Sequence, residues 1–312
     1  MSTQFGIGGT RIGWADLPER VRTALTERLG ADVESEASQP GGFSPGLAAR
    51  LRLSDGRRVF VKAVGLQRNP DSPAMHRREI RILRTLPPDL PVPALLDSYD
   101  DGDWVALIIE DVEGTSPAMP WRTEEFAEVR TALSALSKRL TPSPIQVEPV
   151  HEAHPELFGN WRALAEDDVD RLPDWAEDHL ELLVELETGA VDAVRGDTLL
   201  HLDLRADNML RTDAGVVFVD WPHACLGAPW FDLVALLPSV GMQGGPNPET
   251  VWQQAVGSSA DPDRVNAALA AVAGFFLVGS VKPAPPNLPT LRTFQRLQGE
   301  VTLDWLRGRL RI

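Results

Sequence analysis

Cysteine is almost missing from this sequence: Cys225 is the single one in 312 residues. One thiol excludes an internal disulfide and argues against a metal site built on thiolates. Basic residues are also scarce, with 30 Lys and Arg against 45 Asp and Glu, which gives a net charge of −15. A nucleic-acid-binding face needs a surplus of positive charge, so we expect no nucleic acid partner. A cationic small molecule remains compatible with this charge.

Long hydrophobic runs are missing too. The N-terminus has no basic segment followed by an apolar stretch, so we expect no signal peptide. The longest apolar stretch, residues 267–281, is shorter than a comfortable membrane span and is expected to form a buried helix. We therefore expect a soluble, cytoplasmic protein without a membrane partner. Its size and 43% apolar content suit one two-lobed unit or two small domains.

The most informative segment is residues 201–208, with a strand-like run at 216–219 behind it. His201, Asp203 and Asn208 reproduce the spacing of the kinase catalytic loop H-R-D-L-x-x-x-N, and Asp220 follows the run. This spacing indicates a phosphotransferase site. The alternative is a chance match to this pattern in a buried turn. Asp220, a second Asp directly after an apolar strand, makes that alternative less favoured.

The residues between Asn208 and Asp220 predict a β-hairpin. Residues 209–211 and 216–219 are strand-like, and the turn-forming residues 212–215 separate them. A hairpin returns its far end to its near end, so we expect Asn208 and Asp220 to lie within reach of one ion. Amide and carboxylate oxygens suit Mg²⁺ held between protein and nucleotide phosphates.

A lysine on a strand follows a segment of small residues. Residues 41–46 contain Gly42 and Ser44, the candidates for contacts with phosphates, although no G-x-G-x-x-G is present and an ordinary turn is the alternative. Strands are predicted at 47–53 and 58–64, with Lys62 near the end of the second. Its V-F-V-K context is close to V-A-I-K, which favours contact with α- and β-phosphates over an exposed strand lysine.

A helix is predicted over residues 72–86, with Ser72 as N-cap and Pro73 as its first residue. Its expected apolar stripe consists of Met75, Ile80, Leu83 and Leu86. Glu79 lies beside this stripe, where an unpaired carboxylate is costly, so we expect it to pair with Lys62. The alternative places Glu79 at the edge of the stripe, facing water.

Two further strands are predicted at 94–99 and 104–109, before the segment 110–114. In a two-lobed kinase, the corresponding segment presents main-chain groups to adenine. Glu110 and Val112 are therefore the candidates for adenine binding through their main chains.

With these residues assembled, the chain resembles the aminoglycoside phosphotransferase family of the protein-kinase-like superfamily, over roughly residues 20–310. The resemblance implies an α+β fold with a small β-rich N-lobe and a mostly helical C-lobe. It also implies that Asp203 is the catalytic base, that Asn208 and Asp220 bind Mg²⁺, and that Lys62 and Glu79 anchor the nucleotide.

The resemblance extends to Asp232, which is similar to the buried Asp that braces the catalytic loop; an ordinary helix N-cap is the alternative. Two positions depart from the family. Many members have Gly at the position of Leu202 and a small or aromatic residue at that of Arg205. Arg205 is a candidate for stabilising the transferred charge, with a surface arginine as the alternative.

We expect the N-lobe at residues 1–111, beginning with a helix over 14–29, and the C-lobe at 112–312, ending with a helix over 289–307. Ten acidic residues lie between Glu166 and Glu187. In the family, helices of this region line the acceptor pocket, so these acids are candidates for binding amines. A solvated helix face is the alternative. Aromatic side chains are a second candidate lining, although core packing is the default for each: Trp161, Trp175, Trp230 and Trp252.

The resulting hypothesis is an ATP- and Mg²⁺-dependent O-phosphotransferase for a small hydroxylated molecule. An aminoglycoside-like antibiotic is the first choice of acceptor, and resistance is the implied role. The alternatives are a metabolic kinase for an amino alcohol, a sugar or a macrolide, and a non-catalytic nucleotide-binding regulatory protein. A protein kinase is disfavoured because Leu202 replaces the H-R-D arginine, no A-P-E follows Asp220, and the span from Asp220 to Asp232 is short.

Overall fold

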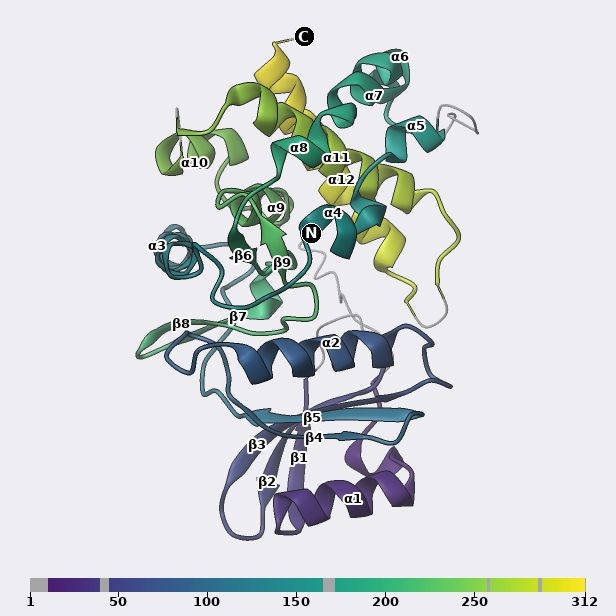
Figure 1. The fold of residues 1–312 in the computed structure, drawn as a ribbon, viewed down its shortest axis with the longest axis vertical. Coiled ribbons are helices and arrows are strands. Elements are labelled where there is room, and N and C mark those ends of the chain that lie inside the picture. The colour runs from purple at the N-terminus through teal and green to yellow at the C-terminus, as the bar shows by residue number, and fades with distance from the viewer. Residues whose placement is uncertain (1–10, 40–44, 165–171, 257–258, 286–287, 312) are drawn as a thin grey trace. The chain divides into compact units, whose positions relative to one another are not determined.

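The structure is a computed structural model that describes residues 11–39, 45–164, 172–256, 259–285 and 288–311. The chain divides into two compact units. Unit 1 contains residues 1–115, 210–223 and 284–290, and unit 2 contains residues 116–209, 224–283 and 291–312. Figure 1 labels their elements.

Unit 1 is built on an antiparallel five-stranded sheet in the order β1-β2-β3-β5-β4. A two-stranded hairpin, β7–β8, follows later in the chain. The described elements are a 3₁₀ turn η1 (Trp14–Asp16), α1 (Glu19–Leu29), β1 (Val33–Ser38), β2 (Leu47–Leu53), β3 (Arg58–Gly65), α2 (Ser72–Thr85), β4 (Leu95–Asp100), β5 (Trp104–Glu110), β7 (Met209–Thr212, with Met209 in unit 2) and β8 (Gly215–Phe218).

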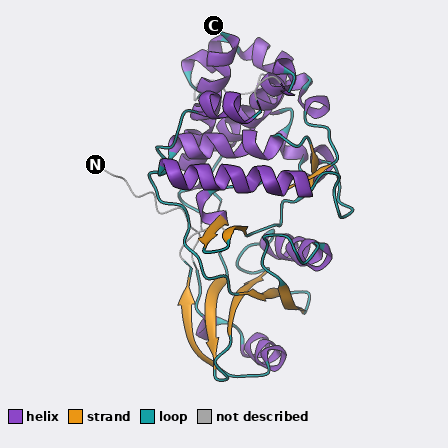
Figure 2. Ribbon diagram, turned by 90° about the vertical axis from the view of Figure 1, so that its left-hand side faces the viewer, coloured by secondary structure: helices purple, strands orange, loops and turns teal. Residues whose placement is uncertain are grey.

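Unit 2 is predominantly helical, as Figure 2 shows, and its one described sheet is the short pair β6–β9. Its described elements are α3 (Thr123–Arg139), α4 (Val150–Ala153), η2 (Pro155–Leu157), α5 (Asn160–Leu164), α6 (Asp174–Asp178), α7 (Leu180–Thr188), α8 (Ala190–Ala193), β6 (Thr198–Leu200), η3 (Ala206–Asn208), β9 (Cys225–Gly227), α9 (Phe231–Met242), α10 (Pro248–Ala255), α11 (Pro262–Ser280) and α12 (Leu291–Leu310). The predicted α+β fold class, with a β-rich part and a helical part, is confirmed.

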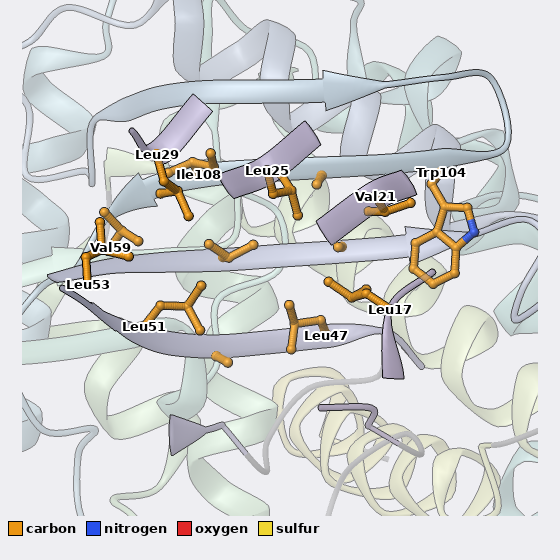
Figure 3. Packing of buried hydrophobic residues seen from close by; sticks show 14 residues of the cluster. Leu17, Val21, Leu25, Leu29, Leu47, Leu51, Leu53, Val59, Trp104 and Ile108 are labelled. Atoms are coloured by element: carbon orange, nitrogen blue, oxygen red, sulfur yellow. The ribbon is translucent and has the colours of Figure 1, made fainter. Parts of the chain in front are cut away.

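The two faces of the unit 1 sheet pack against different helices, because alternate residues of a strand point to opposite faces. Val59, Val61 and Ala63 of β3 join the apolar core beneath α1, together with Val21 and Leu25 of that helix. Figure 3 labels Val59, Val21 and Leu25 in this core. The even-numbered residues of β3, including Lys62, therefore face the side on which α2 packs. This alternation directs Lys62 toward α2.

Several predicted boundaries need correction. The helix expected at 14–29 is interrupted: it is a 3₁₀ turn at 14–16 followed by α1, because Pro18 lacks the N–H that a continuous helix needs and is the N-cap of α1. The N-cap of α2 is Asp71, so Ser72 and Pro73 occupy its first two positions. Asn69 Oδ1 accepts hydrogen bonds from the N–H groups of Asp71 and Ser72 and thereby fixes this start.

The apolar stretch expected to form a buried helix is α11, but the helix is longer than the stretch. It begins at Pro262 behind the N-cap Asp261, whose side chain accepts a hydrogen bond from the N–H of Asp263. Among the described residues, α11 is the one helix long and apolar enough to cross a membrane by length and composition alone, whereas the expectation of too short a span concerned residues 267–281 only. Its apolar window is 72% buried inside the protein, as in a core helix.

Candidate active site

A lysine and two carboxylates form a compact cluster in unit 1, which we call the lysine cluster: Lys62, Glu79 and Asp220. Lys62 Nζ donates to both carboxylate oxygens of Glu79, at 2.8 and 2.9 Å, and to Asp220 Oδ1 at 2.9 Å. An ammonium group has three N–H donors, so these contacts use its full capacity. The predicted pairing of Lys62 with Glu79 is therefore present, and Asp220 joins it.

Burial makes this cluster electrostatically tight. The Glu79 side chain is 2% exposed and that of Lys62 13%, whereas Asp220 is 34% exposed. Burial acts to lower the pKa of Lys62, but the Asp220 and Glu79 carboxylates outweigh it and hold this pKa above its ordinary value. Burial raises the pKa of Glu79, and Lys62 opposes that rise. Two carboxylates surround one ammonium, and Asp220 is the member nearest to solvent, so the cluster suits an added cation beside Asp220.

The segment 201–208 of unit 2 forms a second arrangement, which we call the aspartate loop. Arg205 Nη1 donates to Asp203 Oδ1 at 2.8 Å, and Asn208 Nδ2 donates to Asp203 Oδ2 at 3.0 Å and to the Asp203 carbonyl at 2.7 Å. Each Asp203 carboxylate oxygen therefore has a fixed donor, and the side chain is 26% exposed. The loop holds one partly exposed carboxylate in a defined orientation.

Asp232 of α9 braces the start of this loop. Its carboxylate accepts hydrogen bonds from the main-chain N–H groups of His201, at 2.9 Å, and Leu202, at 2.8 Å. Burial raises the pKa of Asp232, while His201 and these N–H groups act to lower it. Asp232 is the second residue of α9, whose N-cap is Trp230. Asp232 therefore braces the loop and is not a helix N-cap.

The brace holds Leu202 in a backbone conformation that is unfavourable for leucine. Leu202 has φ +62°, in the left-handed region that favours glycine. Leu202→Gly is expected to change the free energy of unfolding by less than about 1 kcal/mol. Relief of backbone strain stabilises the folded variant, whereas loss of the leucine side chain and the greater freedom of glycine in the unfolded chain destabilise it by a similar amount. The matched variant Leu202→Ile should lower it by about 1–2 kcal/mol, since a β-branched residue fits this region worst. Urea denaturation of both variants measures the difference, and equal losses would contradict the assignment of strain.

Arg205, the candidate for stabilising the transferred charge, contacts two carboxylates in this structure, and that candidate role stays a prediction. Its Nε and Nη2 donate to the two carboxylate oxygens of Asp207, at 3.0 and 3.2 Å, while Nη1 holds Asp203. The guanidinium carbon also lies 6.0 Å from the centre of the Phe294 ring. In this structure Arg205 orients Asp203, and Asp207 orients Arg205. Sequence reasoning missed Asp207, although its place two residues after Arg205 was visible.

The remaining nucleotide candidates lie in different parts of unit 1. Gly42 and Ser44 lie outside the described residues. At Gly46, which follows them, an added Cβ would overlap the carbonyl oxygen of Ala63, so only glycine lets the main chain at this position lie so close to β3. The N–H of Glu110 donates to the carbonyl of Ala94, so its candidacy for adenine concerns its carbonyl alone.

Val112 follows β5 in residues 111–114, which form neither helix nor strand. Its neighbour Asp111 anchors the segment: Arg50 Nη1 lies 3.0 Å from Asp111 Oδ1, and Arg58 Nη2 lies 2.8 Å from Oδ2. The Asp111 side chain is 2% exposed. These ion pairs fix the main chain on which the candidate Val112 lies.

The hairpin between the two magnesium candidates is confirmed, since β7 pairs with β8. Asn208 precedes β7 in unit 2, and Asp220 follows β8 in unit 1, so their convergence on one ion stays a prediction. The ligand chemistry fits: the Asn208 amide nitrogen donates to Asp203, so the amide oxygen is the atom of Asn208 suited to bind a cation. The described residues contain no group of three or more His, Cys, Asp or Glu side chains that could hold a metal ion by themselves.

The acidic run divides between solvent and structure. Asp174, Asp178, Glu181 and Glu185 are exposed, as expected for a solvated helix face, and residues 166–170 lie outside the described part. Glu187 is buried and accepts hydrogen bonds from the N–H groups at the start of α5. The described acids therefore favour the solvated-face alternative over an amine-binding lining.

The tryptophans follow the same division. Trp161 and Trp252 are buried in the core, at 0% and 1% exposure, whereas Trp175 and Trp230 are half-buried. Trp161 Nε1 donates to the carbonyl of Ala270. The default of core packing is thus confirmed for Trp161 and Trp252.

Comparison with known proteins finds one matching family model and several similar solved structures. The model of the phosphotransferase enzyme family (APH) matches residues 42–268. No curated protein matches the chain in sequence. Amicoumacin kinase hAmiN, solved with AMP-PNP, Ca²⁺ and Ami, is similar in structure with a TM-score of 0.54 and 11% identity, over 93% of this chain and 95% of that one. A choline/ethanolamine kinase family protein from Mesorhizobium loti has a TM-score of 0.59 and 16% identity, over 94% and 95%. These likenesses establish the kinase-like fold.

Proposed function

The chain belongs to the phosphotransferase enzyme family, and from this premise we propose that it transfers the γ-phosphoryl group of ATP to a hydroxyl group of a small molecule with the help of Mg²⁺. The observation that carries the proposal is that each unit holds one complete part of such a site. Lys62, Glu79 and Asp220 form one part, and the oriented Asp203 with Asn208 forms the other. Family membership identifies an enzyme, so a purely regulatory role is set aside.

We assign the roles of the residues as follows. Lys62 holds the α- and β-phosphates through the N–H that donates to Asp220 in this structure, and Glu79 fixes Lys62 in that orientation. Asn208 and Asp220 would hold the divalent cation, which supplies neutralisation of phosphate charge when it is bound. Gly42 and Ser44 contact phosphates, and the Glu110 carbonyl and the Val112 main chain contact adenine. Residues 1–111 form the nucleotide lobe, and residues 112–312 form the acceptor lobe.

Asp203 is the group that touches the reacting hydroxyl in this proposal. The acceptor oxygen forms a bond to the γ-phosphorus, the bond from that phosphorus to the bridging oxygen breaks, and ADP leaves. The hydroxyl proton passes to Asp203 late in the reaction, because such transition states need positioning more than a strong base. Arg205 and Asn208 hold the two Asp203 oxygens and thereby set the direction from which the hydroxyl approaches.

For the acceptor, we propose an aminoglycoside-like antibiotic first and an amino alcohol second. The net charge of −15 supports an acceptor that carries amines. Kinases named for amicoumacin and for choline or ethanolamine share the fold. A role in antibiotic resistance follows from the first acceptor. A cytoplasmic location follows from the need for ATP.

Asp220→Asn tests the assignment of the cation. Asn keeps an oxygen that accepts from Lys62 but loses the charge that attracts Mg²⁺, so the gain in ATP affinity on adding Mg²⁺ should fall by at least about tenfold. Isothermal titration with ATP, with and without Mg²⁺, measures this gain. Asp213→Asn, in the exposed hairpin turn, is the matched control and should keep it. An unchanged Mg²⁺ dependence in Asp220→Asn would exclude Asp220 as the ligand.

A further inference from the structure

His76 is a buried polar residue beside the lysine cluster to which the proposed reaction assigns no role. It lies on α2, one helical turn before Glu79, and the residue is 6% exposed. Its Nε2 is buried and has no hydrogen-bond partner among the residues that the structure describes. Buried side-chain nitrogens almost always have a partner, and one without costs stability, so an orphan at this place needs a reason.

The surroundings of His76 are charged. Lys62, Asp220 and Arg11 are the charged groups that act on the ring, and burial with the nearby Lys62 lowers the pKa of His76 to about 3. The ring is therefore neutral at physiological pH, with one N–H donor and one acceptor nitrogen. A neutral imidazole near the two cations Lys62 and Arg11 is a poor place for a further cation, and Mg²⁺ prefers oxygen ligands. A phosphate oxygen, which accepts hydrogen bonds and is attracted by both cations, suits this place.

The chain segments near His76 support a phosphate at this position. The N–H of Ile12, next to Arg11, donates to the carbonyl of Gly46, at the end of the small-residue segment. Arg68 Nε donates to the carbonyl of Pro45 in the same segment. Ile12, residues 45–46 and β3 therefore adjoin one another in unit 1, which contains the lysine cluster.

We propose that His76 is a further nucleotide-binding residue, whose Nε2–H donates a hydrogen bond to an oxygen of the phosphates held by Lys62. This inference rests on the proposed function and adds a residue to its nucleotide site. The unpaired Nε2 then gains its hydrogen-bond partner when the nucleotide binds. The stability that the free protein loses through this unpaired nitrogen is offset by that hydrogen bond in the complex. Sequence reasoning assigned the inner face of this helix to Met75, which is 37% exposed.

His76→Phe tests the proposal because it keeps a planar ring and removes the nitrogens. In the free protein it should raise the melting temperature or leave it unchanged, since an unpaired buried polar atom disappears. Its affinities for Mg·ATP and Mg·ADP should fall by about tenfold or more, as expected for a lost hydrogen bond to a charged group. Its affinity for adenosine should stay the same. His76→Gln, which places an amide N–H near the position of Nε2, should recover part of the lost affinity.

His151→Phe is the matched control. His151 Nδ1 is also buried without a partner among the described residues, but it lies in α4 of unit 2. This variant should keep the full affinity for nucleotides. Unchanged affinity of His76→Phe for Mg·ATP and Mg·ADP would overturn the inference. A lower melting temperature together with an equal loss for adenosine would overturn it as well, because His76 would then be structural. Failure of the unmodified protein to bind Mg·ATP would instead overturn the proposed function.

Discussion

Replacing Asp203 by Asn is expected to lower the turnover number by about 10²–10⁴-fold, the usual contribution of a positioned general base. Asn has nearly the shape of Asp and keeps one of the two acceptor oxygens that Arg205 and Asn208 contact, so the loop should keep its overall fold. The amide, however, cannot take the hydroxyl proton. Affinity for Mg·ATP should change little, because Asp203 contacts the acceptor hydroxyl in the proposed site and is neither a phosphate contact nor a ligand of the cation. Steady-state kinetics with a transferable acceptor and nucleotide titration measure the two effects.

Two controls make the Asp203 prediction specific. Asp192→Asn removes an exposed carboxylate of unit 2 that pairs with Arg195 at the surface, and it should leave turnover unchanged. Circular dichroism of Asp203→Asn should match that of the unmodified protein. Transfer at the unmodified rate by Asp203→Asn would remove Asp203 from the mechanism. A loss of Mg·ATP affinity as large as the loss of turnover would move its role from proton acceptance to binding.

Replacing Lys62 by Met is expected to lower the free energy of unfolding by about 3–5 kcal/mol, because it leaves the buried Glu79 carboxylate without its partner. The same variant should bind Mg·ATP more weakly. Glu79 is 2% exposed, so water cannot replace the lost ammonium group at its oxygens. Urea denaturation gives the change in stability, and the slope of that transition shows whether the variant still unfolds in one step.

A second replacement separates the buried charge from general damage at this position. Lys62→Met combined with Glu79→Leu removes both charges and should be more stable than Lys62→Met alone, as for other buried ion pairs replaced by apolar residues. The double variant should still bind nucleotide weakly, because Lys62 is absent. Equal stability of the single and double variants would show that the cost lies in packing and not in the unpaired carboxylate.

Much of unit 1 could be predicted from the sequence because its strands alternate. The range of β2 was predicted as observed, and β3 extends one residue further, to Gly65. Strand β1 was missed: it is an edge strand whose residues after Val33 are all exposed, so its sequence shows no apolar period. The predicted helix at 14–29 ignored Pro18, where local chemistry overrides an amphipathic pattern.

The parts of the candidate site that could be predicted are those in which the positions of residues along a strand or helix decide which side chains meet. Lys62 on a strand and Glu79 on a helix meet because the even-numbered face of β3 is covered by α2. The buried face of α2 was harder to predict, because Met75 and His76 both precede Glu79 by about one turn. Met75 was predicted to be buried from its hydrophobicity, but the structure buries His76 and exposes Met75. The roles of Arg205 and Asp207 could not be predicted, since a sequence does not show which carboxylate a guanidinium will contact.

The most direct test of the central claim is transfer of a labelled γ-phosphoryl group from Mg·ATP to hydroxylated small molecules, followed by chromatography. The compounds would include amicoumacin, aminoglycosides, macrolides, amino alcohols and sugars. We predict that label appears on at least one compound with the unmodified protein and is lost with Asp203→Asn. Label that remains on ATP, or that passes to water equally fast with both proteins, would contradict the assignment of a small-molecule phosphotransferase with Asp203 at its centre.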